Sequence, residues 1–251
     1  MSDGTLIRVG GSSFHGTVDR HAPFEGFAFV EFEGWGDAPA ARGESVERPD
    51  GHGDFDTPVT RGARLITMSG WCRARELAML GHRRNELMSL LADGVQGRVE
   101  VTEYGETTWA NVRLYGTPTF KRRGSTGYAD WSLKLRAVDP RRYGAVHEYP
   151  AGVAAVQYGN FPATPRLLVG AGSGDYTVTG PDGRRVEVVA APAGAHYIDF
   201  AAGGLYTADG QRQPRAVSVY QPWAVPVGAP GVTVSISGSR SLVQQVTDTF
   251  M

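Results

Sequence analysis

Alternating hydrophobic and polar residues, the pattern typical of β-strands, recur along this chain. The clearest example is residues 128–138, where Trp131, Leu133 and Leu135 share one face and polar residues share the other. Further strands are predicted at residues 24–32, 61–70, 95–104, 108–115, 166–169, 175–179, 184–189, 196–200, 216–220 and 231–237. Turn residues such as Asp209-Gly210 separate the short strands of the second half, a spacing that indicates a β-sandwich.

Residues 24–32 combine a dry face with a mixed one. Ala28 and Val30 fall on the face predicted to be buried, whereas Phe27 and Phe29 fall on the opposite face beside glutamates. Such a mixed face suits either the rim of a partly covered sheet or a contact with another subunit. Phe27 and Phe29 are therefore the candidate inter-subunit residues of this strand.

A single helix is predicted over residues 74–92, where leucines such as Leu80 and Leu87 recur at helical spacing. Asp93-Gly94 ends this helix, because glycine adopts the left-handed conformation after a helix without strain. Gly81 lies inside the helix and costs about 1 kcal/mol relative to alanine. A close approach of another backbone near Gly81 would explain that cost.

Residues 34–60 carry no periodic apolar pattern, and so long a segment inside a domain predicts either an arm or a disordered loop. Its acidic residues Asp50, Asp54 and Asp56, with His52, superficially resemble a calcium loop. They lack the glycine at position six and the final glutamate of an EF-hand. No metal site is predicted here.

The chain is predicted to be mainly β and to contain two domains. Asp139-Pro140 ends a strand, because proline cannot donate a hydrogen bond to a sheet. The boundary is placed within residues 144–152, which gives an N-terminal domain of residues 1–144 and a C-terminal domain of residues 145–251.

A basic hairpin tip precedes this boundary, at Lys121-Arg122-Arg123-Gly124. A solvated turn would explain the charges, and so would contact with an acidic neighbouring protein. Arg122 and Arg123 are therefore further candidate inter-subunit residues.

Composition narrows the classes of partner. The chain has 34 glycines, 15 prolines and a formal net charge of −1, so it offers no strong field to nucleic acid or to an anionic membrane. Cys72 is the single cysteine, which excludes an intrachain disulfide. The N-terminus lacks the features of a signal peptide, and no apolar run approaches membrane-spanning length. We therefore expect a protein that is assembled in the cytosol and has no membrane partner.

The sequence contains no recognisable catalytic, metal-binding or cofactor-binding signature. The glycines of residues 170–174 lack the Lys-Ser/Thr of a phosphate-binding loop. Cys72 lies in a predicted strand, where burial would raise its thiol pKa. The histidines lack metal-binding spacing; they are His15, His21, His52, His82, His147 and His196. An enzyme is not expected, although paired carboxylates far apart in sequence leave a cell-wall hydrolase as a rival hypothesis.

Aromatic residues of the second half suggest a different rival. Tyr206, Tyr220 and Trp223 could stack on the apolar faces of sugar rings and so form a carbohydrate-binding surface. Packing in the core and at sheet edges would equally account for them. The alternative function is thus recognition of host cell-wall glycans by the C-terminal sandwich.

Four motifs occur in register along nearly the whole chain: Gly53-Asp-Phe-Asp-Thr-Pro58, Gly62-Ala-Arg-Leu-Ile-Thr-Met-Ser-Gly70, Asp139-Pro-Arg-Arg-Tyr143 and Gly159-Asn-Phe-Pro-Ala-Thr-Pro165. With the helix that follows the second motif, they resemble the distal tail (Dit) proteins, or minor tail proteins, of phages with long non-contractile tails. The family has no catalytic motif to transfer.

The resemblance implies a tail-tube-like N-terminal ring domain, with β-sandwich-like sheets and one helix, followed by a galectin-like C-terminal β-sandwich. It implies a homo-hexameric ring at the tail tip of the virion, assembled in the host bacterial cytoplasm. Its expected partners are the tail tube protein and a tail-tip hub or tail-associated protein, with the tape-measure protein as a further candidate. DNA would pass through the lumen without sequence recognition. Residues 34–60 depart from the family pattern, because the segment is long for a simple connection; an arm that clasps a neighbouring subunit is one role open to it.

Overall fold

The computed structural model describes residues 4–16, 18, 23–44 and 46–251. The chain divides into two compact units, Met1–Arg142 with Met251, and Tyr143–Phe250. The range 144–152, where the sequence places the domain boundary, is occupied mostly by strand β11. The break that Asp139 and Pro140 predict lies between strands β10 and β11.

The first unit contains ten strands and one helix among its described residues. They are β1 (Leu6–Val9), β2 (Ser12–His15), β3 (Gly26–Glu33), β4 (Ala41–Arg42), β5 (Thr60–Arg61), β6 (Arg64–Arg73), α1 (Leu77–Ser89), β7 (Gly97–Glu103), β8 (Glu106–Leu114), β9 (Thr119–Arg122) and β10 (Tyr128–Ala137).

Its main sheet closes on itself. The strand order is β8-β7-β1-β2-β3-β6-β10-β9, and an additional pairing joins β10 back to β8 through Leu135 opposite Leu114. Strands β2 and β3 are parallel, whereas the other pairs with printed registers are antiparallel. This closure pairs backbone groups of β8 and β10 that an open sheet edge would leave exposed.

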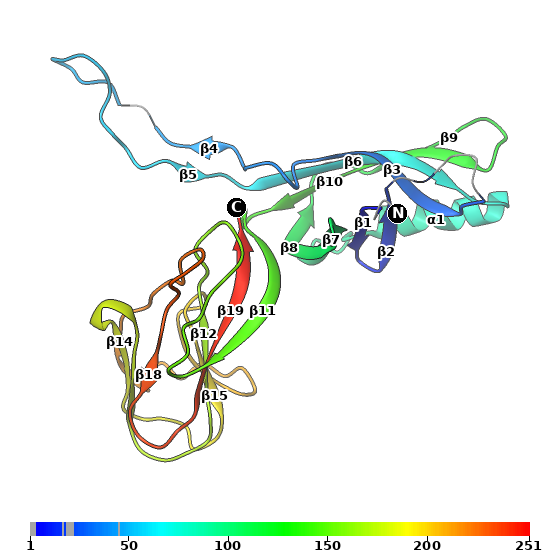
Figure 1. Ribbon diagram of the computed structural model, residues 1–251. Coiled ribbons are helices and arrows are strands. Elements are labelled where there is room, and N and C mark those ends of the chain that lie inside the picture. The colour runs from blue at the N-terminus through cyan, green and yellow to red at the C-terminus, as the bar shows by residue number, and fades with distance from the viewer. Residues whose placement is uncertain (1–3, 17, 19–22, 45) are drawn as a thin grey trace. The chain divides into compact units, whose positions relative to one another are not determined.

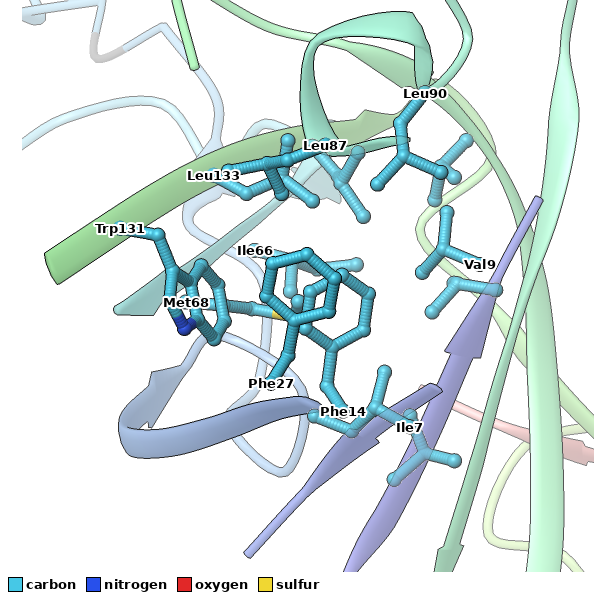
Figure 2. Packing of buried hydrophobic residues seen from close by; sticks show 14 of the residues in the cluster. Ile7, Val9, Phe14, Phe27, Ile66, Met68, Leu87, Leu90, Trp131 and Leu133 are labelled. Atoms are coloured by element: carbon cyan, nitrogen blue, oxygen red, sulfur yellow. The ribbon is translucent and has the colours of Figure 1, made fainter. Parts of the chain in front are cut away.

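The closed sheet surrounds one hydrophobic core. Rings of Phe14, Phe27 and Trp131 meet in its centre, with the Phe14 and Trp131 centroids 4.9 Å apart (Figure 2). Leu87 and Leu90 approach this cluster from the helix and the residue after it. The helix therefore covers part of the core, as its leucine spacing predicts.

Helix α1 is shorter than the predicted 74–92. Its N-cap, Glu76, makes no side-chain capping bond, and Leu91 adopts a positive φ of 51° that is incompatible with continuing the helix. Gly81 is exposed, and a Cβ placed there would meet no atom within 4 Å. The expected close backbone approach is wrong: Gly81 is an unforced weak point on the solvent side.

The face of β3 that points to the core is not the one predicted for residues 24–32. Val30 turns outward and is 64% exposed, and the strand carries a bulge at this point, where its register against β6 shifts between Phe29 and Glu31. Phe27 and Phe29 point inward, with Phe27 only 1% exposed. Placing Val30 on the dry face was therefore wrong, because the phenylalanine side of the strand packs into the core, and the bulge then lets Phe32 join Phe29 there.

The second unit contains nine strands and one short 3₁₀ turn. They are β11 (Arg142–Pro150), β12 (Arg166–Val169), β13 (Tyr176–Thr179), η1 (Pro181–Gly183), β14 (Arg185–Val188), β15 (His196–Asp199), β16 (Gly204–Thr207), β17 (Val217–Tyr220), β18 (Ser235–Ile236) and β19 (Leu242–Phe250).

These strands form the two layers of a sandwich. One layer has the order β16-β15-β12-β19-β11 and the other has the order β17-β14-β13-β18. A single core lies between them, to which Leu167 and Ile198 contribute from the first layer and Val178 and Val186 from the second. The mainly β fold with one α-helix is confirmed. The strand predicted at residues 231–237 is reduced to the two residues of β18.

Candidate functional site

Residues 34–63, here called the arm, leave the main sheet between β3 and β6 and return as a long hairpin (Figure 1). Strands β4 and β5 pair within it, and a bridge joins Glu47 to Asp54 nearer the tip. The Phe55 N–H donates to the Val46 carbonyl at 2.8 Å. Of the two predictions for this segment, the arm rather than the disordered loop matches the structure.

A buried arginine fixes the base of the arm. Arg64 is 1% exposed although it opens strand β6. Its Nε donates to the Pro140 carbonyl at 2.9 Å. Its Nη1 lies 2.6 to 2.8 Å from three carbonyl oxygens at the arm's base, those of Gly34, Trp35 and Asp37.

Burial disfavours the charged form of Arg64. Burial, with a smaller contribution from the charge of Arg142, lowers the pKa of Arg64 to about 10, and Asp37 opposes this fall. The side chain remains a cation at neutral pH and meets the partial negative charges of backbone carbonyls. Arg64 therefore anchors the base of the arm to the closed sheet.

The outer part of the arm exposes apolar side chains. Val46, Phe55 and Val59 are 46%, 52% and 65% exposed, and Arg48 lies over the Phe55 ring at 5.6 Å. Two short strands cannot bury these side chains within the arm itself. The arm thus presents an apolar surface that its own unit does not cover.

Of the two phenylalanines predicted as inter-subunit contacts, Phe27 belongs to the interior, whereas Phe29 is partly buried and its contact role stays a prediction. Phe27 is enclosed by Phe14 and Trp131, so it cannot reach another chain in this fold. Phe29 is partly buried against the same core and lies over Gly16, where a Cβ would be 2.7 Å from its ring.

Arg122 and Arg123 are exposed, as the prediction of a hairpin tip requires. Arg123 is already engaged, because its guanidinium donates to both carboxylate oxygens of Asp130 at 2.7 and 2.5 Å. Arg122 ends strand β9 and forms no such ion pair with another described residue. A role for either residue in contact between subunits stays a prediction.

The three aromatic residues proposed for sugar stacking are not equivalent. Trp223 is 5% exposed and packs edge-to-face on Phe200 at 4.7 Å, so its ring faces are unavailable to a sugar. Tyr206 stacks on Tyr197 with ring planes 11° apart. Tyr220 lines a pocket at the end of strand β17. Trp223 must therefore be withdrawn from the candidate surface, because a core position takes its ring.

Chemistry elsewhere in the described chain is sparse. Burial raises the pKa of the Cys72 thiol to about 12, as its predicted strand position implied. No group of three or more His, Cys, Asp or Glu among the described residues could hold a metal ion; His21 lies outside those residues. Within the same residues, no helix combines the length and hydropathy that crossing a bilayer requires.

Two arginines escaped prediction. Arg64 shares the inward face of its strand with Ile66 and Met68, so its position in the alternation was the available signal. Arg212, which lines the pocket beside Tyr220, sits in a stretch without periodicity and gave no signal.

Neither a protein-family model nor a curated protein sequence matches the chain. Solved structures do match it. SPP1 Dit, described as a paradigm of the hub adsorption apparatus in phages that infect Gram-positive bacteria, is 17% identical with a TM-score of 0.70, and the match covers 89% of this chain and 94% of that one. The chain has the Dit fold.

Two structures of the phage P2 baseplate in its activated conformation, with Ca and with Sr, share this fold more distantly. Their TM-scores are 0.52 and 0.51 at 7% identity, and each match covers 96% of this chain and 97% of the other. All three similarities span both units of the chain. The expected similarity to Dit proteins is thus confirmed at the level of the fold.

Proposed function

We propose that this protein is a non-enzymatic structural subunit of a phage tail tip, a distal tail protein. The observation that carries the proposal is the fold match to SPP1 Dit, which extends over 89% of this chain and 94% of that one. A match of this extent spans both units of the chain. It therefore supports a similar architectural role better than a match to one unit would.

Within this role, six copies form a closed ring that joins the tail tube protein to a tail-tip hub or tail-associated protein. The tape-measure protein is a further partner, and DNA passes through the lumen without being read. Assembly takes place in the host cytoplasm, and the final location is the tail tip of the virion.

The arm supplies one side of the contact between neighbouring copies. A cyclic ring needs two different complementary surfaces on every subunit. The exposed side chains of Val46, Phe55 and Val59 supply apolar area on an element that extends from its own unit. Burying them against the next copy would stabilise the ring through the hydrophobic effect.

Native mass spectrometry of the full chain at high concentration tests the ring, with a hexamer as the expected species. Phe55→Ser should weaken assembly about tenfold per interface, because the exposed part of the Phe55 ring would no longer be buried against the next copy. Val227→Ser is the matched control, since Val227 is 47% exposed but lies in the second unit. Monomer alone at every concentration, with and without a purified tube or hub protein, would contradict the proposal.

A further inference from the structure

The pocket beside Tyr220 lies wholly within the second unit. It has a volume of about 400 Å³ and is lined by residues 203–205 and 212–214 with Val217 and Tyr220. Strand β16 and the loop that follows it form one wall, and the start and end of β17 form the other. Pockets of roughly 300–1,000 Å³ suit small ligands, so the space is sufficient for a single sugar ring.

Arg212 is held in a defined position at this pocket. Its Nη2 donates to the Gly203 carbonyl at 2.7 Å, and a backbone bridge pairs it with Tyr206. A Cβ on Gly204 would lie 3.1 Å from Arg212 Nε, so the missing side chain leaves room for the guanidinium. Within the described chain, only Gly203 accepts a hydrogen bond from this guanidinium. Its remaining N–H groups are available to a ligand.

The other walls combine apolar surface with one amide. The Tyr220 hydroxyl donates to the Asp199 carbonyl at 3.2 Å, and its ring packs edge-to-face on Phe200 at 5.7 Å. Tyr220 is therefore a fixed wall rather than a mobile side chain. Pro214 and Val217 add apolar surface, and Gln213 supplies an amide that can donate and accept.

Asp199, the buried acid whose backbone carbonyl accepts from Tyr220, already has partners for its carboxylate. Asp199 accepts two hydrogen bonds from Arg166, at 3.0 and 2.7 Å, and two more from the N–H groups of Ala201 and Ala202. Arg215 is exposed in the same loop as Arg212 and adds a second positive charge. Asp209, the acid of the hairpin, accepts a hydrogen bond from Thr207.

We propose that this pocket binds an anionic sugar unit, with the carboxylate or phosphate on Arg212 and the sugar ring against Tyr220 and Val217. A guanidinium pairs well with either anion through two parallel hydrogen bonds. The apolar face of a sugar ring suits the tyrosine and aliphatic wall. The site adds ligand binding to the architectural role, and it does not depend on ring formation.

Saturation-transfer-difference NMR on the full chain tests the site, because the method tolerates both a monomer and a large ring. The probes are glucuronic acid and glucose 1-phosphate, with glucose and inorganic phosphate as comparisons. We expect both charged sugars to bind at least tenfold more tightly than glucose. The glucuronic acid and glucose 1-phosphate arms also identify which anion the pocket prefers.

Arg212→Gln should weaken binding of both charged sugars about 10- to 100-fold, since a charge-assisted hydrogen-bond pair is lost. Val217→Phe, which fills the pocket but keeps Arg212, should also weaken it at least tenfold. Arg8→Gln removes the same charge from an exposed strand residue of the first unit and should change nothing.

Three results would overturn the proposal. Glucose binding as tightly as glucuronic acid would remove the role of the charge. Inorganic phosphate binding as tightly as glucose 1-phosphate would leave an anion site without sugar recognition. Unchanged binding by the folded Val217→Phe variant would place the ligand elsewhere. None of these results bears on the hexamer, so the two proposals fail separately.

Discussion

Replacing Arg64 with methionine should destabilise the first unit by about 3 kcal/mol. The Nη1 nitrogen carries two hydrogens and Nε carries one, so the four contacts amount to three full hydrogen bonds, each contributing about 1.5–3 kcal/mol. Burial opposes them, because the fall of the Arg64 pKa from 12.5 to about 10 corresponds to about 3 kcal/mol against the charged form. With about 2 kcal/mol for each of the three bonds, the difference leaves about 3 kcal/mol.

Denaturation by urea followed through tryptophan fluorescence measures this change, because four of the five tryptophans lie in the first unit. Limited trypsin digestion adds a local measurement, since loss of the Arg64 hydrogen bonds at the base of the arm should speed cleavage at Arg42, Arg48 and Arg61. Arg61→Met is the control for the denaturation experiment. Arg61 is exposed and its guanidinium donates to the Pro39 carbonyl at 3.2 Å, so it should change stability by less than about 1 kcal/mol. Equal stability of the Arg64 and Arg61 variants would refute the anchoring role of Arg64.

Three further predictions follow from contacts inside the two units. Burial lowers the pKa of His196 below its usual 6.5, so the unfolded chain takes up a proton at a higher pH than the folded protein does. The free energy of unfolding should therefore fall as pH drops below about 6.5. Urea titrations at pH 7.5 and 5.5 measure this, and His196→Gln should reduce the difference between them. Gly70→Ala should destabilise the protein by more than about 2 kcal/mol, because the added Cβ would lie 2.1 Å from the Ala28 carbonyl oxygen. Gly81→Ala should instead stabilise it by about 0.5–1 kcal/mol. Thermal melting compares the two variants, and equal changes of melting temperature would contradict the packing described for these glycines. Trp223→Ala should cost about 3–5 kcal/mol in calorimetry through loss of core packing, and a variant as stable as the parent would contradict its burial.

The sequence predicts best where one strand face is uniformly apolar. Strand β10 matches its prediction to within one residue, because Trp131, Leu133 and Leu135 alternate with polar residues throughout. Strand β19 was missed, because its inward positions include Gln244 and Asp248 beside Leu242 and Val246. Buried polar residues break the hydrophobic alternation without changing the backbone geometry.

The same reason explains why the candidate sites were harder to predict than the fold. Arg64 donates to the backbone carbonyls of residues 34, 35, 37 and 140, and the sequence does not reveal that these segments meet around one side chain. Trp223 and Tyr220 are three residues apart and both aromatic, yet one is enclosed and the other lines a pocket. Side-chain environment depends on the tertiary contacts of each position, which residue type alone does not encode.

The arm connects the first unit's interior to its proposed partner surface. A two-stranded ribbon of this kind is at best marginally stable in water, so its order must come from its attachments. At its base, Arg64 converts backbone carbonyls of the arm into ligands of a buried cation. At its outer end, Val46, Phe55 and Val59 remain uncovered by their own unit. In the proposed ring, the base sets the direction of the arm before assembly, and the next copy covers the outer end. Because the direction is set in advance, less conformational entropy is lost when each contact closes.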